Sequence, residues 1–517
     1  MTKIDADLLA IQRVRDVTVE AKAAQKELEK FSQEQLDRIV RAMAEAAESE
    51  AENLAKMAVK ETGFGVVEHK VIKNLFAARD VYESIKNTRT VGIVREDKQK
   101  GVMESVNPYG VIAAIIPSTN PTSTAIFKCL VAVKARNAIV ISPHPSAREC
   151  TIRAAEICAN AAYAAGAPRG LIGWLEKPTL EATNALMTHR NVDLILATGG
   201  SGLVRAAYSS GKPAYGVGPG NVPAYIEETA DISKAVKDIM DSKTFDNGTI
   251  CASEQAVIVD NSIRSRVVDE FRAHHAYFLS PEEKTAVGEV VFPSPGKLNA
   301  EIVGKSATYI AKMAGISVPD HTRVLIGEEE NFGKEFPFSL EKLSPLLGFY
   351  SVENWEDGCE VSLKLLEVGG RGHTLVIHSQ DKAIIKEFFM KKPVSRILVN
   401  TPSSLGAIGA TTGLRPSFTL GCGTYGGNIT SDNVTLEHLM NVKRLAYETR
   451  SIEIPGSTTC LTPSKKELSM HEEVVQTVLE EIRPYSQKFT KEQISKIIAD
   501  VLANVQINHM SGSRTIK

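Results

Sequence analysis

A cysteine in a polar, glycine-containing loop is the residue of this chain best suited to act as a nucleophile. Cys251 ends the stretch Phe-Asp-Asn-Gly-Thr-Ile-Cys and comes three residues after Gly248. A nucleophilic thiolate needs access and nearby N–H donors, which the backbone of such a turn can supply. The chain has seven cysteines, with no Cys-x-x-Cys pair and no His/Cys cluster of zinc spacing. We therefore predict no metal site, and we expect the other cysteines to be small buried side chains.

Two further segments place polar or glycine-rich residues directly after short apolar runs. Asn120 stands between two prolines after the run 111–116, where its side-chain amide could donate to an oxyanion or cap the next helix. The segment 199–202, Gly-Gly-Ser-Gly, follows the run 192–197 and precedes a helical pattern, as in pyrophosphate sites at helix N-termini. Ligands of open α/β sheets bind beyond the carboxyl ends of the strands, so both segments are candidates for a binding site.

These residues must be positioned by buried strands, which the chain supplies in two sets. Residues 1–90 have a helical pattern, and short apolar runs then alternate with helical segments of about 10–15 residues. The first set of runs is 111–116, 138–142, 170–175 and 192–197. The second set is 255–259, 322–326, 374–378 and 397–399. This alternation predicts an α/β fold with two doubly wound, mostly parallel sheets.

The composition excludes two classes of protein. The 517 residues carry a net charge of −2, whereas a nucleic-acid binder would show a basic excess. The apolar runs are far too short to span a bilayer, and the first residues lack the regions of a secretory signal. We therefore expect a cytoplasmic protein with neither nucleic acid nor membrane as a partner.

The order of these motifs resembles the aldehyde dehydrogenase superfamily. Asn120, the glycines from 199, the segment 216–221, Cys251 and Glu341-Lys-Leu-Ser-Pro follow one another as in that family, over residues 1–455. The resemblance implies a Rossmann-like cofactor domain, an α/β catalytic domain and a β oligomerisation arm. It also implies that Cys251 is the nucleophile, and that Asn120 and the Cys251 N–H form the oxyanion hole.

An NAD site follows from the same resemblance, with Glu341 at the nicotinamide ribose. The lysine usual at the adenosine ribose is absent, since the sequence there is Ser-Pro-His-Pro-Ser-Ala from position 142. NAD is favoured over NADP by the resemblance alone. The residues expected to line the cofactor site are Ser142, His144, Pro145, Gly199, Gly200, Ser201, Gly218 and Glu341.

The departures from the family point to coenzyme A (CoA) as a co-substrate. Hydrolytic members carry a glutamate that activates water, and here that position is Gly216. Without a positioned base, water loses a rate enhancement of about 10²–10⁴, whereas a thiol needs less help. Together with Gly372-His373-Thr374 and the segment 426–433, this departure resembles the CoA-acylating subfamily. His373 could stand near the active site or the CoA path, or could be structural in a glycine-rich turn.

Pattern and resemblance together divide the chain into four parts. These are an NAD-binding domain at 1–224, a catalytic α/β domain at 225–420, a return to the cofactor domain at 421–455, and a linker with a tail at 456–517. A helix and then a strand at 451–455 are expected to end the third part. The arm hairpin near 90–107 and residues 453–455 are expected to pair across subunits, giving a homodimer or tetramer.

The tail carries a short amphipathic helix with its own start signals. Thr490 and Gln493 form a candidate capping box, and Phe489 with Ile494 a candidate hydrophobic staple. Residues 489–505 resemble encapsulation peptides of bacterial microcompartment enzymes, which bind shell proteins. The alternatives are a helix that docks on its own oligomer and, since the polar face is not strongly basic, a less favoured membrane-surface helix. The apolar face consists of Ile494, Ile497, Ile498, Val501, Leu502 and Val505.

The predicted function is NAD-dependent oxidation of a short-chain aldehyde to its acyl-CoA through a Cys251 thioester, inside a microcompartment lumen. Three alternatives remain open. A hydrolytic aldehyde dehydrogenase would release a free acid, and an acyl-phosphate reductase would need a phosphate site and NADPH. A catalytically inactive scaffold would organise a shell through the tail.

Overall fold

The computed structural model describes residues 5–452, 465–485, 489–490 and 492–501, in two compact units, Met1–Tyr447 and Glu448–Lys517. The first unit contains a five-stranded parallel sheet of order β5-β4-β3-β6-β7. Its strands are β3 (Val111–Ile115), β4 (Ala138–Ser142), β5 (Ile172–Trp174), β6 (Leu194–Thr198) and β7 (Ala214–Val217). Every residue of β3 and β4 is buried, as expected for strands with helices on both faces.

Helices from the first 210 residues surround this sheet. α1 packs against β3, β4, β5 and α8, whereas α6 packs against β4, α7 and α2. All of α6 is buried, which accounts for the run of apolar and small side chains along its length. The helices are α1 (Ala6–Leu28), α2 (Gln33–Ser49), α3 (Ala51–Thr62), α4 (Val67–Leu75), α5 (Val81–Ile85), α6 (Pro121–Lys134), α7 (Arg148–Ala164), α8 (Leu180–Thr188) and α9 (Ser201–Tyr208), with a π-helical turn η1 (Phe76–Asp80).

A second, seven-stranded parallel sheet has the order β10-β11-β12-β9-β8-β13-β14. Its strands are β8 (Val222–Ile226), β9 (Glu254–Asp260), β10 (Ala276–Phe278), β11 (Val324–Glu328), β12 (Leu346–Val352), β13 (Gly372–His378) and β14 (Val394–Val399). Its helices include α10 (Ile232–Thr244), α11 (Arg264–Ala273), α12 (Pro281–Val291), α13 (Ala307–Met313), α14 (Trp355–Val368), α15 (Lys382–Lys391) and α16 (Ser403–Gly406). The two sheets confirm the predicted α/β class.

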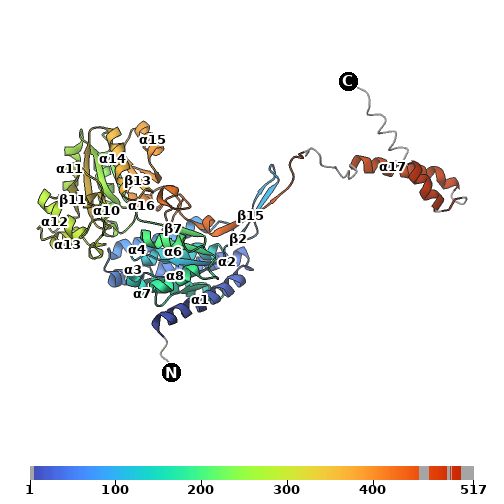
Figure 1. Cartoon of the computed structure of the whole chain (residues 1–517), viewed down its shortest axis with the longest axis horizontal. Coiled ribbons are helices and arrows are strands. Elements are labelled where there is room, and N and C mark those ends of the chain that lie inside the picture. The colour runs from blue at the N-terminus through green and yellow to red at the C-terminus, as the bar shows by residue number, and fades with distance from the viewer. Residues whose placement is uncertain (1–4, 453–464, 486–488, 491, 502–517) are drawn as a thin grey trace, which may run out of the picture. The chain divides into compact units, whose positions relative to one another are not determined.

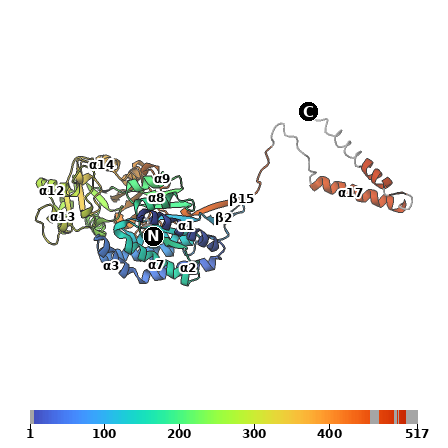
Figure 2. The same cartoon turned by 60° about the horizontal axis from the view of Figure 1, so that its bottom comes forward.

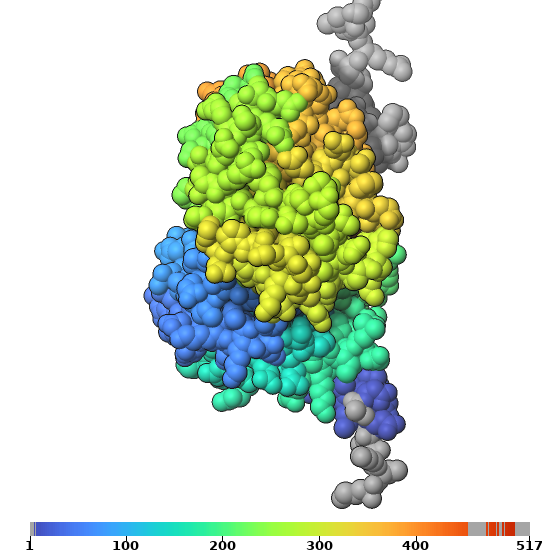
Figure 3. All heavy atoms as spheres, turned by 90° about the vertical axis from the view of Figure 1, so that its left-hand side faces the viewer, coloured from blue at the N-terminus to red at the C-terminus, as the bar shows by residue number. Residues whose placement is uncertain are grey.

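The two sheet regions adjoin within the first unit, with residues from about 225 onward in green to orange above the blue and teal helices (Figure 3). The expected boundary between residues 224 and 225 falls inside β8. The second sheet therefore begins earlier, at Val222, because β8 is hydrogen-bonded to β9 and β13.

A third, antiparallel sheet has the order β1-β2-β15, with β1 (Ile93–Asp97), β2 (Val102–Pro108) and β15 (Met440–Ala446). β2 and β15 lie side by side in both views (Figures 1 and 2). The helix expected near the end of 421–455 is wrong. The structure has two 3-10 turns, η6 (Thr424–Gly426) and η7 (Leu436–Leu439), and then β15, because β2 offers an edge with which this last segment pairs along its whole length. Of the strand expected at 451–455, residues 451 and 452 are described and are not in a strand, and residues 453–455 lie outside the described residues.

The second unit contains α17 (Lys465–Ile482), the 3-10 turn η8 (Arg483–Tyr485) and a helix at 492–501. The predicted capping box is confirmed, since Thr490 N donates to Gln493 Oε1 at 2.9 Å and Gln493 N donates to Thr490 Oγ1 at 3.4 Å. The last two apolar positions, Leu502 and Val505, lie outside the described residues. None of the helices in the described ranges combines the length and apolar character needed to cross a membrane.

Candidate active site

A cavity of about 500 Å³ opens at the carboxyl ends of β3, β4, β6 and β7, facing the loop that precedes β9. It brings together nearly all the site residues that were predicted from the sequence. Those that line it are Asn120, Ser142, His144, Pro145, Gly199, Gly200, Gly218, Cys251 and Glu341. Ser201 is the exception, because it is exposed as the first residue of α9 and does not line the cavity.

The part of the cavity above β6 and β7 leaves the backbone accessible. An ideal Cβ on Gly200 or Gly218 would meet no atom within 4 Å, so a ligand can approach the main chain there. Gly200 is the N-cap of α9 and has no side chain to satisfy the first N–H groups of that helix. This end of the cavity therefore fits a pyrophosphate.

The outer part of the cavity lies beyond β4 and is neutral. Ser142 Oγ lies 2.9 Å from Thr183 Oγ1, and Ser146 N donates to His144 Nδ1 at 3.2 Å. Burial lowers the pKa of His144, which keeps its imidazole uncharged. Among the residues that line the cavity there is no lysine or arginine.

Cys251 lies in the cavity wall, three residues after a tight turn, η3 (Phe245–Gly248). Cys251 is only partly accessible, so the expectation of an exposed nucleophile loop is met only in part. Burial and the nearby charge of Glu341 raise the pKa of the Cys251 thiol to about 12. Near neutral pH the resting thiol is therefore protonated.

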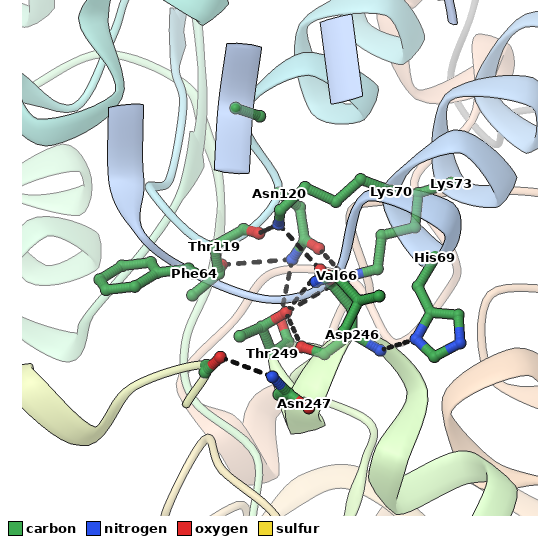
Figure 4. A network of polar contacts seen from close by, with 12 residues as sticks. Phe64, Val66, His69, Lys70, Lys73, Thr119, Asn120, Asp246, Asn247 and Thr249 are labelled. Atoms are coloured by element: carbon green, nitrogen blue, oxygen red, sulfur yellow. Dashed lines mark hydrogen bonds and ion pairs between the residues drawn. The ribbon is translucent and has the colours of Figure 1, made fainter. Parts of the chain in front are cut away.

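Asn120 faces the Cys251 loop and does not cap α6 with its side chain. Its Nδ2 donates to Thr249 O at 3.1 Å, and its Oδ1 accepts a hydrogen bond from Lys73 Nζ at 2.6 Å (Figure 4). Of the two interpretations left open by the sequence, helix capping is therefore wrong. The Asn120 Nδ2 donor is hydrogen-bonded to Thr249, which is two residues before Cys251 in the sequence.

The residues that hold this loop were not predicted from the sequence. His69, Lys70 and Lys73 project from one face of α4 toward Asp246, to which both lysines form ion pairs (Figure 4). Their positions, i, i+1 and i+4, lie on one side of a helix. Charged residues on a helix ordinarily face solvent, so this spacing did not mark them as buried. The sequence feature that could have pointed to them is Asp246, the acidic residue directly before Asn247 and Gly248 in the turn that precedes Cys251.

Gly216, which the sequence suggested as the place of the water-activating glutamate, does not face the cavity, whereas its neighbour Val217 lines it, so the structure does not support that assignment. An ideal Cβ on Gly216 would lie 2.7 Å from Val204 Cγ1 and 3.0 Å from Tyr208 Cε2, both on α9. A carboxylate side chain would therefore collide with α9. Among the residues that line the cavity, Glu341 is the one carboxylate.

Glu341 sits at the inner end of the cavity. Gly220 N donates to its Oε1 at 3.2 Å, and burial raises its pKa to about 7. It is therefore partly protonated near neutral pH. Within the described residues, no group of three or more His, Cys, Asp and Glu side chains is arranged to hold a metal.

His373, whose role the sequence left open, lies beside the nucleophile loop. An ideal Cβ on Gly220 would be 2.1 Å from Cys251 O and 3.4 Å from His373 Cγ, so this glycine separates the two residues. Burial lowers the pKa of His373 to about 3, and its Nε2 has no hydrogen-bond partner among the described residues. It is a neutral imidazole with a free nitrogen.

Comparison with known sequences gives the same family throughout. The model of the aldehyde dehydrogenase family matches residues 8–306. The bifunctional aldehyde-alcohol dehydrogenase AdhE of Escherichia coli K12 is 51% identical over 430 residues, 82% of this chain and 48% of that protein. The acetylating succinate-semialdehyde dehydrogenase of Clostridium kluyveri is 37% identical, covering 86% of this chain and 97% of that protein. The chain spans about half the length of the aldehyde-alcohol dehydrogenases it matches.

Solved structures agree in fold. An acetylating aldehyde dehydrogenase from Geobacillus thermoglucosidasius is 58% identical with a TM-score of 0.86, covering 87% of this chain and 100% of that one. A propionaldehyde dehydrogenase from a fucose utilisation microcompartment of Clostridium phytofermentans is 32% identical with a TM-score of 0.77, covering 84% and 97%. A Rhodopseudomonas palustris propionaldehyde dehydrogenase with bound CoA and an acylated cysteine is 29% identical with a TM-score of 0.77, covering 84% and 97%.

Proposed function

The chain belongs to the aldehyde dehydrogenase family, and from this premise we propose that it oxidises a short-chain aldehyde to its acyl-CoA with NAD. The observation that carries the proposal is the lining of the cavity. Glu341 is the one carboxylate among the lining residues, and its proposed place is at the nicotinamide ribose, so no carboxylate is left there to activate water. The acyl group on Cys251 then awaits a nucleophile that needs less activation, and a thiol is such a nucleophile.

Two residues carry the first chemical step in this proposal. Cys251 Sγ attacks the aldehyde carbonyl, and the oxyanion that forms accepts hydrogen bonds from Asn120 Nδ2 and the Cys251 backbone N–H. Asn120 Nδ2 now donates to Thr249 O and Thr119 Oγ1, so it exchanges one of these acceptors for the oxyanion as the negative charge develops. The thiol proton passes to solvent, because Glu341, the one carboxylate among the lining residues, is assigned to the nicotinamide ribose.

NAD, when bound, supplies the acceptor for the hydride that leaves the aldehyde carbon. The residues proposed to hold it are Gly199, Gly200 and Gly218 at the pyrophosphate, Ser142, His144 and Pro145 at the adenosine, and Glu341 at the nicotinamide ribose. NAD is proposed rather than NADP because a 2′-phosphate needs a cationic partner, and no lysine or arginine is among the lining residues.

CoA completes the turnover by accepting the acyl group from Cys251 as a thioester. We assign the CoA thiol proton to His373, which is buried behind Gly220 and whose Nε2 has no hydrogen-bond partner among the described residues. A neutral imidazole can accept this proton only transiently, since burial disfavours its charged form. The related propionaldehyde dehydrogenase that was solved with CoA and an acylated cysteine supports this order of events.

Omitting CoA tests the proposal. With CoA we expect continuous NADH formation, and without it about one equivalent per active site, followed by a rate at least about 10²-fold lower. The measurement is NADH absorbance together with chromatography of the acyl product, over a panel of small aldehydes. CoA lacking its sulfur is the matched control, and it should fail to restore turnover. Free acid formed at full rate without CoA would instead establish the hydrolytic alternative.

The β arm is proposed to join subunits into a dimer or tetramer. Ile93, Val442 and Leu445 lie on this three-stranded sheet and are 44–50% exposed, an unusual position for large apolar side chains. Both outer strands also present unpaired edges within the described chain, which favours pairing with another copy.

The second unit is proposed to direct the enzyme into a bacterial microcompartment. The helix at 492–501 begins with a complete capping box and presents Ile494, Ile497, Ile498 and Val501 at spacing i, i+3, i+4 and i+7. A helix of this kind can lie in an apolar groove of a shell protein. The relative from a fucose utilisation microcompartment supports this setting.

Deleting residues 457–517 should leave kcat/KM within about twofold of the full chain, because the cavity is built entirely from the first unit. Co-sedimentation with purified shells should be lost. The pair Ile497→Asn and Ile498→Asn should also lose it, whereas the matched pair Lys496→Ala and Asp500→Ala on the polar face should retain it. A truncated enzyme with a much lower Tm would show that the second unit serves the fold.

A further inference from the structure

The carboxamide of Asn120 can act on an oxyanion in only one of its two orientations. One end of the group donates through Nδ2 and the other end accepts through Oδ1, and rotation about the last side-chain bond exchanges them at little intrinsic cost. In the wrong orientation Oδ1 would face the oxyanion and repel it. A catalytic asparagine therefore needs a neighbour that distinguishes oxygen from nitrogen.

Lys73 is that neighbour. Its ammonium group has three N–H donors and no acceptor, so only Oδ1 can face it. Lys73 Nζ lies 2.6 Å from Asn120 Oδ1, which turns Nδ2 toward Thr249 O at 3.1 Å and Thr119 Oγ1 at 3.2 Å (Figure 4). Thr249 is two residues before the nucleophile, so the donor end faces the Cys251 loop.

Lys73 is itself fixed from several sides. Its side chain is 2% exposed, and its Nζ donates to Asp246 Oδ2 at 2.5 Å and to Thr249 Oγ1 at 3.3 Å. The same ammonium lies 5.5 Å from the centre of the Phe245 ring, within the range of a cation–π contact. A buried ammonium with this many partners has little freedom to leave Asn120.

Asp246 anchors the arrangement to the nucleophile turn. Its carboxylate accepts from Val66 N and Thr249 Oγ1, both at 2.8 Å, besides the two lysines. Asp246 and Asn247 have φ values of 51° and 52°, a left-handed conformation that Asp and Asn tolerate better than most residues. One buried carboxylate thus ties α4 to the turn that carries Cys251.

The charge state of Lys73 suits this role. Burial lowers its pKa to about 8, and the negative charge of Asp246 opposes that shift, so the ammonium form prevails at pH 7. Burial disfavours the Asp246 carboxylate, but the charges of Lys73 and Lys70 outweigh it and lower its pKa to about 2. Two cations therefore face one anion, and the surplus positive charge lies beside the site where the oxyanion forms.

We propose that Lys73 is a positioning residue, which acts by holding the Asn120 carboxamide with Nδ2 toward the substrate oxygen. This inference rests on the proposed function, in which Asn120 is an oxyanion donor. It adds a residue from α4, far from the glycine-rich and cysteine motifs in sequence, to the reaction.

Lys70 provides a matched control on the same helix face. Lys70 Nζ also pairs with Asp246 Oδ2, at 2.8 Å, and its side chain is 3% exposed. Its other partner is Thr119 O at 3.1 Å, and it has no hydrogen bond to Asn120. Removing either ammonium therefore takes one buried charge from Asp246, but only one of the two changes releases the carboxamide.

The test is a double-mutant cycle in the full chain, with Lys73→Met, Asn120→Ala and the two combined, beside Lys70→Met. We expect Lys73→Met to lower kcat about 10–10²-fold, part of the loss of a full oxyanion donor, with little change in the KM for aldehyde. Lys70→Met should lower kcat by about threefold at most. In the Asn120→Ala background, Lys73→Met should have almost no further effect, because there is no carboxamide left to orient.

The outcomes separate the inference from the function on which it rests. If Asn120→Ala lowers kcat but Lys73→Met lowers it further by the same factor in that background, Lys73 acts on the fold or on the thiol, and the inference is wrong. This holds even where Lys73→Met lowers Tm, since damage to the fold would persist without Asn120. If Asn120→Ala leaves kcat unchanged, the oxyanion role in the proposed function fails, and the inference fails with it.

Discussion

Cys251→Ala is expected to lower NADH formation by at least about 10⁴-fold, as loss of a covalent nucleophile does in other enzymes. No other side chain in the cavity wall can form the thioester, since Cys251 is the one cysteine among the lining residues. The measurement is steady-state NADH absorbance with saturating aldehyde and CoA, together with mass spectrometry of the protein after single turnover.

Cys150→Ala is the matched control, because Cys150 is a buried cysteine in the first turn of α7 that packs with Ala58 and Ala147. It should keep kcat within about threefold of the parent. A Cys251→Ala enzyme that still made acyl-CoA at the parent rate would rule out the thioester mechanism. An acyl adduct on any other cysteine would do so as well.

Asn120→Ala is expected to lower kcat by about 10²–10³-fold, the usual effect of removing one oxyanion donor. The effect should fall on kcat and kcat/KM alike, because the donor is used most strongly after the carbonyl oxygen has become charged. Stopped-flow measurement of the first equivalent of NADH isolates this step from the later transfer to CoA.

Asn120→Asp sharpens that prediction. A carboxylate in place of the carboxamide would pair with Lys73 and turn a negative charge toward the oxyanion, so this variant should be at least as slow as Asn120→Ala. If either variant raised the KM for aldehyde and left kcat unchanged, Asn120 would contribute to ground-state binding only.

Elements with strong local signals could be predicted from the sequence. The run 138–142 matches β4 residue for residue, because it is buried on both faces and a proline follows it. The helical segment expected between the runs 170–175 and 192–197 is α8, whose N-cap Thr179 accepts from Ala182 N. The strand β15 was missed because its residues after Met440 are exposed and lack the apolar run of a buried strand.

The site could be predicted in part, for a physical reason. Most residues that line the cavity follow strand ends or glycine-containing turns, and both can be recognised in the sequence from apolar runs and glycines. Nothing in the sequence indicates that Lys73 belongs to the site. An ammonium group on a helix ordinarily faces water, and its partner Asp246 lies 173 positions away. Only the packing of α4 on the nucleophile turn shows that this charge is buried.

The contact of Gly216 with α9 bears on where β7 can accept a larger side chain. Any side chain at this position would be driven into Val204 and Tyr208, whereas the next residue of the strand, Val217, lines the cavity. A protein engineer who wishes to place a carboxylate in this wall should therefore replace Val217 and leave Gly216 unchanged. The alternation along the strand gives one of these neighbours to the covering helix and the other to the bound ligand.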